Sequence, residues 1–291
     1  MTTKKIKGDV FMIKTKQFGK VLAISAILNA SVIGGTTAVY AAEGNDGAEY
    51  SSDAAVKFIP NTDPTKPIDP EGPGVGPVIP IDPLNPGGPN PGTDGPLSID
   101  FASSLQFGTQ KIVSTDVTYY AYSQQVVNQA GETINKPNYV QVSDNRGSAA
   151  GWNLTVKQEG EFTTTEDVKN KDLKGSMITL DGTTAYTEGT GSEEPTVYKG
   201  LDLIPGESVQ VMSAAKNQGE GTWVARFGSS ETDLKDDEKS LVEVDDEMVE
   251  QKINKNHKVS LLVPGKIAKS AASYKTNLIW TLSEVAGNDE E

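Results

Sequence analysis

Short runs in which apolar and polar residues alternate dominate the chain from Leu97 onward. Examples are Val209-Gln-Val211 and the run Trp-Val-Ala-Arg-Phe at 223–227. This alternation predicts half-buried strands, because successive side chains of a strand point to opposite faces. Turn-forming residues separate the runs. Roughly ten strands over residues 97–286 predict an all-β domain, either a β-sandwich or a distorted barrel.

Two of the predicted strands contain the tripeptide Trp-x-Leu. Trp152 and Leu154 lie in G-W-N-L-T-V, and Trp280 and Leu282 lie in L-I-W-T-L-S-E. In each strand the Trp and Leu share an apolar face and polar residues occupy the other face, which is typical of a core strand. The alternative is a Trp platform that stacks on a sugar and donates its indole N–H. We interpret the two motifs as neighbouring strands that close the domain.

The N-terminal residues 1–42 are typical of a secretory signal peptide. Basic residues precede an apolar run at 21–28, and small residues then lead to Ala41-Ala42. The run is shorter than the roughly 20 residues that span a bilayer. We therefore expect no membrane span after cleavage, with a retained N-terminal anchor as the alternative. The long basic stretch before Met12 leaves the start of translation, Met1 or Met12, open.

An acidic segment rich in Pro and Gly, residues 43–96, follows the signal peptide. The stretch 59–96 holds 12 of the 16 Pro of the chain. Since Pro lacks a backbone donor, this density argues against a helix or a central strand. We predict a disordered, semi-extended stalk with glycine hinges. The folded part would then be residues 97–286 alone.

Charge and cysteine content narrow the possible partners. Residues 1–41 carry a net charge of +5, so their removal takes the chain from −14 to −19. Such an acidic protein repels polyanions, and we expect neither nucleic acid nor an anionic membrane surface as a partner. The chain has no Cys. Eukaryotic secreted domains commonly rely on disulfides, so their absence favours an exported Gram-positive bacterial protein.

Catalytic and metal-binding patterns are missing from the sequence. With one His and no Cys, the chain lacks the residues for a zinc site or a Cys–His or Ser–His pair. We expect no enzyme, no cofactor and no metal site; a pair of carboxylates that cleaves glycans is the enzymatic alternative. Segment 231–250 holds ten acidic residues and two Lys. It predicts a solvated face, or a helix within 233–255, with a low-affinity calcium site as the functional alternative.

Taken in order, these features resemble the WxL domain family of Gram-positive cell-surface proteins. A signal peptide and a Pro-rich spacer precede five matching blocks, which are Leu97-Ser-Ile-x-Phe101, Val142-Ser-Asp-Asn-Arg-Gly147, Gly151-Trp-Asn-Leu-Thr-Val156, Thr222-Trp-Val-Ala-Arg-Phe-Gly228 and Leu278-Ile-Trp-Thr-Leu282. The resemblance covers nearly all of the predicted folded part.

The resemblance implies a secreted protein that binds the cell wall non-covalently, with peptidoglycan as the partner. It makes Trp152, Leu154, Trp280 and Leu282 the candidate peptidoglycan-binding residues. An adhesin, or a subunit of a surface complex that binds another protein or the host matrix, is the alternative function. The sequence carries no LPxTG-type sorting motif, so we expect retention on the cell surface to be non-covalent.

Overall fold

All regular secondary structure that the structure describes is β. The computed structural model describes residues 50–72, 76–189, 191–244 and 247–285. These ranges contain sixteen strands and no helix. The predicted all-β class is therefore confirmed, with more strands than the roughly ten that the alternating pattern indicated. The predicted signal peptide, 1–42, lies outside the described residues.

Two of the sheets have four strands each. The sheet that contains both Trp-x-Leu motifs has the order β10 (Thr196–Val197), β12 (Ser208–Ala214), β7 (Trp152–Gln158) and β16 (Leu278–Glu284). A second four-stranded sheet has the order β2 (Leu97–Ala102), β6 (Tyr139–Asp144), β13 (Gly221–Phe227) and β9 (Thr183–Tyr186). We call the first of these the WxL sheet.

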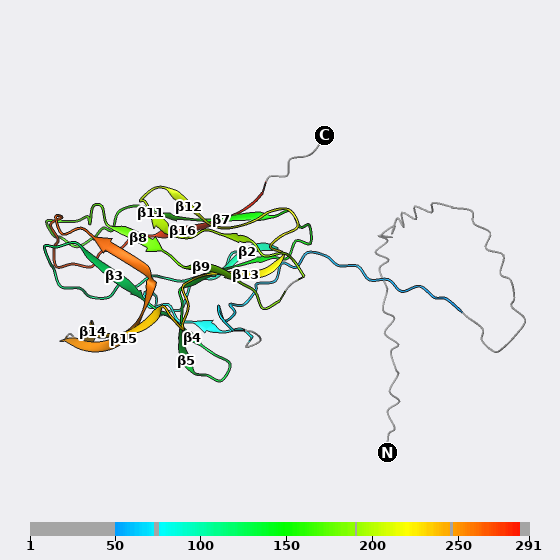
Figure 1. Ribbon diagram of the computed structural model, residues 1–291, viewed down its shortest axis with the longest axis horizontal. Helices are drawn as coiled ribbons and strands as arrows, with labels where there is room; N and C mark the ends of the chain where they lie inside the picture. The colour runs from blue at the N-terminus through cyan, green and yellow to red at the C-terminus, as the bar shows by residue number, and fades with distance from the viewer. Residues whose placement is uncertain (1–49, 73–75, 190, 245–246, 286–291) are drawn as a thin grey trace, which may run out of the picture. The chain divides into compact units, whose positions relative to one another are not determined.

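The remaining strands form two further sheets. One has the order β11 (Leu201–Leu203), β8 (Met177–Leu180), β15 (Glu247–Val263) and β14 (Leu234–Val244), with β3 (Val117–Tyr122) also paired to β15. The other has the order β1 (Ile79–Pro80), β4 (Gln124–Val127) and β5 (Thr133–Lys136). Every strand pair in the four sheets is antiparallel. Figure 1 shows their arrangement.

Three of the sheets share one hydrophobic core. Each sheet contributes alternate side chains to it, such as Val142 from β6, Leu180 from β8 and Val156 from β7. In β7 the burial alternates along the whole strand, with every second residue fully buried. A smaller cluster on the other side of β6 contains Phe101 and Tyr139. Several small sheets packed around a shared core therefore make up this β-sandwich.

The two Trp-x-Leu strands lie side by side, as their pattern predicted. β16 pairs antiparallel with β7, which places Trp280 opposite Val156 and Leu282 opposite Leu154. Some 130 residues of sequence separate the motifs, so this contact closes the domain between distant parts of the chain. The hypothesis that the motifs form neighbouring closing strands is confirmed.

The folded part begins before residue 97, contrary to the boundary predicted from Pro content. Ile68 and Val78 are buried, and β1 pairs with β4. Val78 N donates a hydrogen bond of 2.9 Å to the carbonyl oxygen of Pro67. Pro is tolerated at sheet edges because its missing donor can face away from the ladder. The described residues from 66 to 81 thus pack on the domain, whereas 50–64 are exposed and contain no strand.

The acidic segment forms a long hairpin, and the helix considered for 233–255 is not formed. β14 and β15 pair from Leu234 with Asn256 to Val244 with Glu247. The other half of β15 is fixed in the sheet by β3 and β8. That anchoring extends the strand into the charged segment, where helical spacing was weak. His257, expected near a strand start, lies inside β15 and stacks on Tyr120.

Candidate functional site

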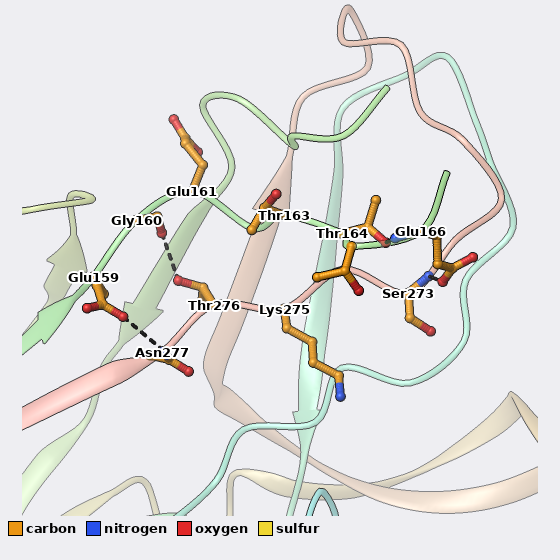
Figure 2. A pocket seen from close by; sticks show the side chains of 11 residues that line it. Glu159, Gly160, Glu161, Thr163, Thr164, Glu166, Ser273, Lys275, Thr276 and Asn277 are labelled. Carbon is orange, nitrogen blue, oxygen red and sulfur yellow. Dashed lines mark hydrogen bonds between the residues drawn. The ribbon is translucent and has the colours of Figure 1, made fainter. Parts of the chain in front are cut away.

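A polar cleft lies where the two Trp-x-Leu strands meet. Residues 159–166 directly follow β7, and residues 273–277 directly precede β16. The two segments continue the ladder of the strands, because Glu159 N donates to Asn277 O at 2.9 Å. Thr163 and Lys275 exchange two backbone hydrogen bonds, of 2.9 and 2.8 Å. Figure 2 shows the segments running alongside each other.

The cleft has a volume of about 550 Å³, which suits a ligand of a few hundred daltons. All of its lining residues except Gly160 have polar or charged side chains. The lining residues are Glu159, Gly160, Glu161, Thr163, Thr164, Thr165, Glu166, Ser273, Lys275, Thr276 and Asn277. Three Glu and one Lys give it an acidic character.

Hydrogen bonds fix the three Glu side chains of the cleft. Glu159 accepts a bond of 2.9 Å from Asn277 Nδ2, and Glu166 accepts one of 2.7 Å from Ser273 N. Glu161 Oε1 accepts from Gly175 N at 3.2 Å. Within the described residues, the buried Oε2 of Glu161 has no hydrogen-bond partner.

A polar surface, which we call the outer face, adjoins the cleft on the WxL sheet. On β7 it consists of the side chains that alternate with the core residues, among them Asn153 and Thr155. Thr155 lies opposite Thr281 of β16, and Asn153 lies opposite Ser283. Gln210 of β12 donates to Asn153 Oδ1 at 3.0 Å, which orients its amide. The outer face therefore presents hydroxyls and amides in rows at strand spacing.

Trp152 and Leu154, the first pair of candidate binding residues, lie in the core. Both have 0% of their surface exposed. The indole Nε1 of Trp152 donates to the carbonyl oxygen of Gly219 at 2.9 Å, so its polar atom is paired inside the protein. Neither residue presents a surface to a ligand, and both support the outer face from beneath.

Trp280 and Leu282, the second pair, are only half buried. They point to the same side of the WxL sheet as Trp152 and pack against the core. The ring of Trp280 lies 6.5 Å from that of Phe227, centre to centre. Because β16 is the last strand of its sheet, these residues keep part of their surface at its edge. The structure thus separates the two motifs into a buried pair and an edge pair.

An ion-pair cluster connects the two motifs at the end of the strands opposite the cleft. Arg146 binds Asp144 through Nε and Nη2, at 2.8 and 2.7 Å. Its Nη1 reaches Glu284 at 2.7 Å, and Nη2 also donates to Gly151 O at 2.9 Å. The hydrogen bond with Asp144 raises the pKa of Arg146 above its ordinary value. The charged guanidinium therefore holds the start of β7 to the end of β16.

No motif in the sequence marks the cleft, the outer face or the role of Glu284. The cleft residues come from two polar segments that carry no recognisable motif. The only sequence feature that marks the two segments is their position. One follows the first Trp-x-Leu strand and the other precedes the second. Within the described ranges, no group of three or more His, Cys, Asp or Glu is placed to hold a metal ion. No helix found there could cross a bilayer.

The comparison with protein families gives one match. A family model described as WxL domain surface cell wall-binding matches residues 45–285, most of the chain. The match begins within the Pro-rich segment, in agreement with the packing of residues 66–81. No curated protein and no solved structure matches the chain.

Proposed function

Because the chain belongs to the WxL domain family of surface cell wall-binding proteins, we propose that it binds peptidoglycan and is retained non-covalently on the cell surface. In this proposal the protein is exported through the N-terminal signal peptide of a Gram-positive cell. The outer face of the WxL sheet and the adjoining cleft form the binding surface. The protein acts there by binding, without a catalytic step.

The adjacency of the two motif strands is the observation that carries the proposal. Pairing of β7 with β16 creates both the rows of hydroxyls and amides and the cleft at their end. Sugars present many hydroxyls at their surface, and paired donors and acceptors at fixed spacing recognise such groups. Trp152 and Leu154 contribute by keeping this surface rigid. Trp280 and Leu282 are the members of the original set that could touch a glycan at the sheet edge.

The charge of the protein favours peptidoglycan over other wall polymers. The chain with its signal peptide removed carries −19, which disfavours contact with the phosphates of teichoic acids. The cleft adds three Glu on the proposed surface. A wall component that carries hydroxyl, amide and amino groups suits this surface better than a polyanion does.

Co-sedimentation with purified sacculi tests the proposal. The chain lacking its signal peptide is mixed with sacculi that retain teichoic acids and with sacculi stripped of them. We expect retention on both. Failure to pellet with stripped sacculi would refute direct peptidoglycan binding. Release of soluble sugars would instead indicate a glycan-cleaving enzyme.

Isosteric variants test the surface itself. The double variant Thr155→Val/Thr281→Val keeps the β-branched shape and removes two hydroxyls from the outer face. Each lost hydrogen bond is worth about 0.5–1.5 kcal/mol, so retention should weaken by roughly tenfold. The matched control is Thr118→Val/Thr133→Val, which alters exposed strand threonines of β3 and β5. Equal retention of the two double variants would exclude the outer face.

The hairpin favours a second function, binding to another protein as an adhesin or a subunit of a surface complex. Val244, Met248 and Val249 are 41%, 52% and 41% exposed near its tip. Exposed apolar groups beside acidic ones are typical of protein-binding surfaces. Retention that requires other surface proteins, and is lost when Met248 becomes Ser, would support this function over direct wall binding.

A further inference from the structure

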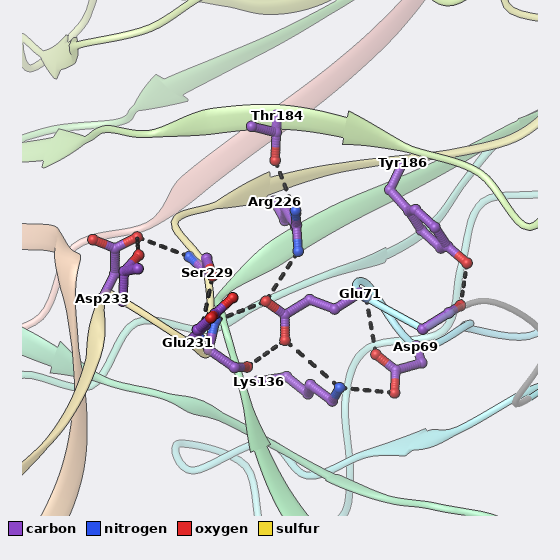
Figure 3. A network of polar contacts seen from close by, with 12 residues as sticks. Asp69, Glu71, Lys136, Thr184, Tyr186, Arg226, Ser229, Glu231 and Asp233 are labelled. Carbon is purple, nitrogen blue, oxygen red and sulfur yellow. Dashed lines mark hydrogen bonds and ion pairs between the residues drawn. The ribbon is translucent and has the colours of Figure 1, made fainter.

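Partly buried ion pairs fix part of the Pro-rich segment to the domain. We call residues 66–72 the clasp segment. Asp69 Oδ2 lies 3.0 Å from Lys136 Nζ, and Glu71 Oε1 lies 2.9 Å from Arg226 Nη1. Ser230 donates to Glu71 through its backbone N, at 2.7 Å, and through its hydroxyl. Figure 3 shows the acidic side chains of the clasp segment directed at these partners from β5 and β13.

An apolar anchor and backbone bonds complete the contact. Ile68, 7% exposed, packs into the small cluster with Tyr139 and Val224. Gln141 of β6 accepts from Ile68 N at 2.8 Å and donates to Lys66 O at 3.0 Å. A domain that captures an extended peptide uses the same combination of backbone bonds and side-chain pockets. Lys136, Gln141, Tyr186, Arg226 and Ser230 thus hold the clasp segment as a peptide-binding surface would, and we call this surface the clasp groove.

The clasp groove distinguishes between two similar peptides of this chain. The sequence Pro-Ile-Asp-Pro occurs at 67–70 and again at 80–83. Glu71 follows the first copy, whereas Leu84 follows the second. Asp82 of the second copy is occupied elsewhere, because it accepts bonds of 2.8 Å from Leu84 N and from Ser104 Oγ. Only Pro-Ile-Asp-Pro-Glu supplies the carboxylate that Arg226 and Ser230 bind.

The clasp segment is bonded to the chain just before β1, and the stretch that connects this unit to β2 is long and mostly exposed. After β1, residues 82–92 lead to Thr93, whose N donates to Ile99 O at the edge of β2. These eleven residues include four Pro and three Gly. In a Pro-rich extended conformation they span roughly 35 Å at about 3.1 Å per residue. A connection of this reach allows the clasp segment, together with β1, to bind either its own domain or a neighbouring one.

We propose that the clasp groove also binds the clasp segment of a second copy of this chain, so that two copies join by reciprocal exchange. Exchange replaces each intramolecular contact with an identical intermolecular one, so it costs little once copies are concentrated on a surface. The clasp groove is distinct from the outer face and the cleft. Dimerisation therefore leaves the proposed wall-binding surface free.

Charge reversal on both sides of one ion pair tests the exchange. In Glu71→Arg a positive side chain at position 71 meets Arg226 of the same chain and is repelled. In Arg226→Glu a negative side chain at position 226 meets Glu71 of the same chain and is repelled. In each variant like charges meet in the clasp groove, so closure within one chain or between two identical chains is disfavoured. An equimolar mixture restores one Arg–Glu pair in each of two domains, so we expect a heterodimer by light scattering, with each variant alone monomeric. The double variant Glu71→Arg/Arg226→Glu is the control and should be monomeric at the same concentration.

A peptide gives a second measurement. We expect a capped peptide of residues 62–85 to bind the Glu71→Arg chain at least about tenfold more tightly than the Arg226→Glu chain. Circular dichroism verifies that both chains are folded. A mixture that stays monomeric overturns the exchange, whether or not the peptide binds. If charge reversal unfolds either chain, wild type and mass-labelled wild type are mixed at millimolar concentration, where only monomers in native mass spectrometry would overturn it.

Discussion

Replacing each motif Trp by Ala should separate a core role from an edge role. Trp152 is completely buried and donates its N–H to Gly219. Trp280 is half buried on the last strand of the same sheet. If the motif were a ligand platform, the two residues would be equivalent. Their different surroundings instead predict different losses of stability.

The size of each loss follows from the buried surface. A fully buried Trp removes about 150–250 Å² from water, worth roughly 4–6 kcal/mol at about 25 cal/mol per Å². Truncation of buried aromatic residues typically costs about 3–5 kcal/mol. For Trp152→Ala we expect a loss of about 4–5 kcal/mol, which includes the unpaired carbonyl of Gly219. For Trp280→Ala about half of this, roughly 2 kcal/mol, is expected.

Urea unfolding followed by circular dichroism measures both losses. Because domains are stable by only about 5–15 kcal/mol, Trp152→Phe serves as a milder variant that keeps an aromatic ring at this position and loses the N–H. Co-sedimentation is measured under conditions where each variant is folded. There we expect Trp152→Phe to bind sacculi like wild type. Equal losses for the two Ala variants, or loss of binding by Trp152→Phe at unchanged stability, would refute the assignment of Trp152 to the core.

Three further substitutions test the surroundings of the motifs. Arg146→Lys should cost about 1–3 kcal/mol in urea unfolding because Lys cannot bind Asp144 through two nitrogens while reaching Glu284; an unchanged midpoint would contradict this. Gly151→Ala places a Cβ 2.4 Å from the carbonyl oxygen of Ala214 at a φ of +82°, so its Tm should fall by at least about 4 °C. Burial raises the pKa of Asp100 above 3.8 despite hydrogen bonds from Ser143, Gln141 and Ser98. The folded state therefore binds the proton of Asp100 more readily than the unfolded state does. Protonation of Asp100 stabilises the fold at low pH, and this stabilisation is lost as pH rises through the raised pKa. Asp100→Asn should gain relative to wild type between pH 4 and 7, and a constant difference would argue against it.

The sequence predicted the parts of the fold that follow from local alternation. In β7 the polar positions Asn153, Thr155 and Lys157 alternate with core residues, as the pattern indicated. The pairing of β7 with β16 was also predictable, because two similar strands at the ends of a domain have few other ways to bury their apolar faces. Register, and with it the alignment of Thr155 with Thr281, depends on the whole sheet.

The clasp segment could not be predicted, because its contacts join residues far apart in the chain. For the described residues between 59 and 96, Pro density correctly excluded a helix and a central strand. It did not exclude an edge strand or an extended peptide held by side chains. Lys136 and Arg226, which bind the clasp segment, give no local sign of this role. The helix considered for 233–255 failed for the same reason, since pairing with β3 and β8 decided the conformation of β15.

The positions of the motif residues bear on how a family signature relates to a binding surface. Trp152, Leu154 and the Asp144–Arg146–Glu284 cluster are held by packing and internal bonds, so substitutions there alter folding first. The outer face between them consists of side chains whose exchange costs the fold little. Trp152 and Leu154 therefore form a framework beneath the outer face. If the outer face and the cleft form the wall-binding surface, as we propose, exchanging the residues between the motif positions and in the cleft should change which wall component the domain binds.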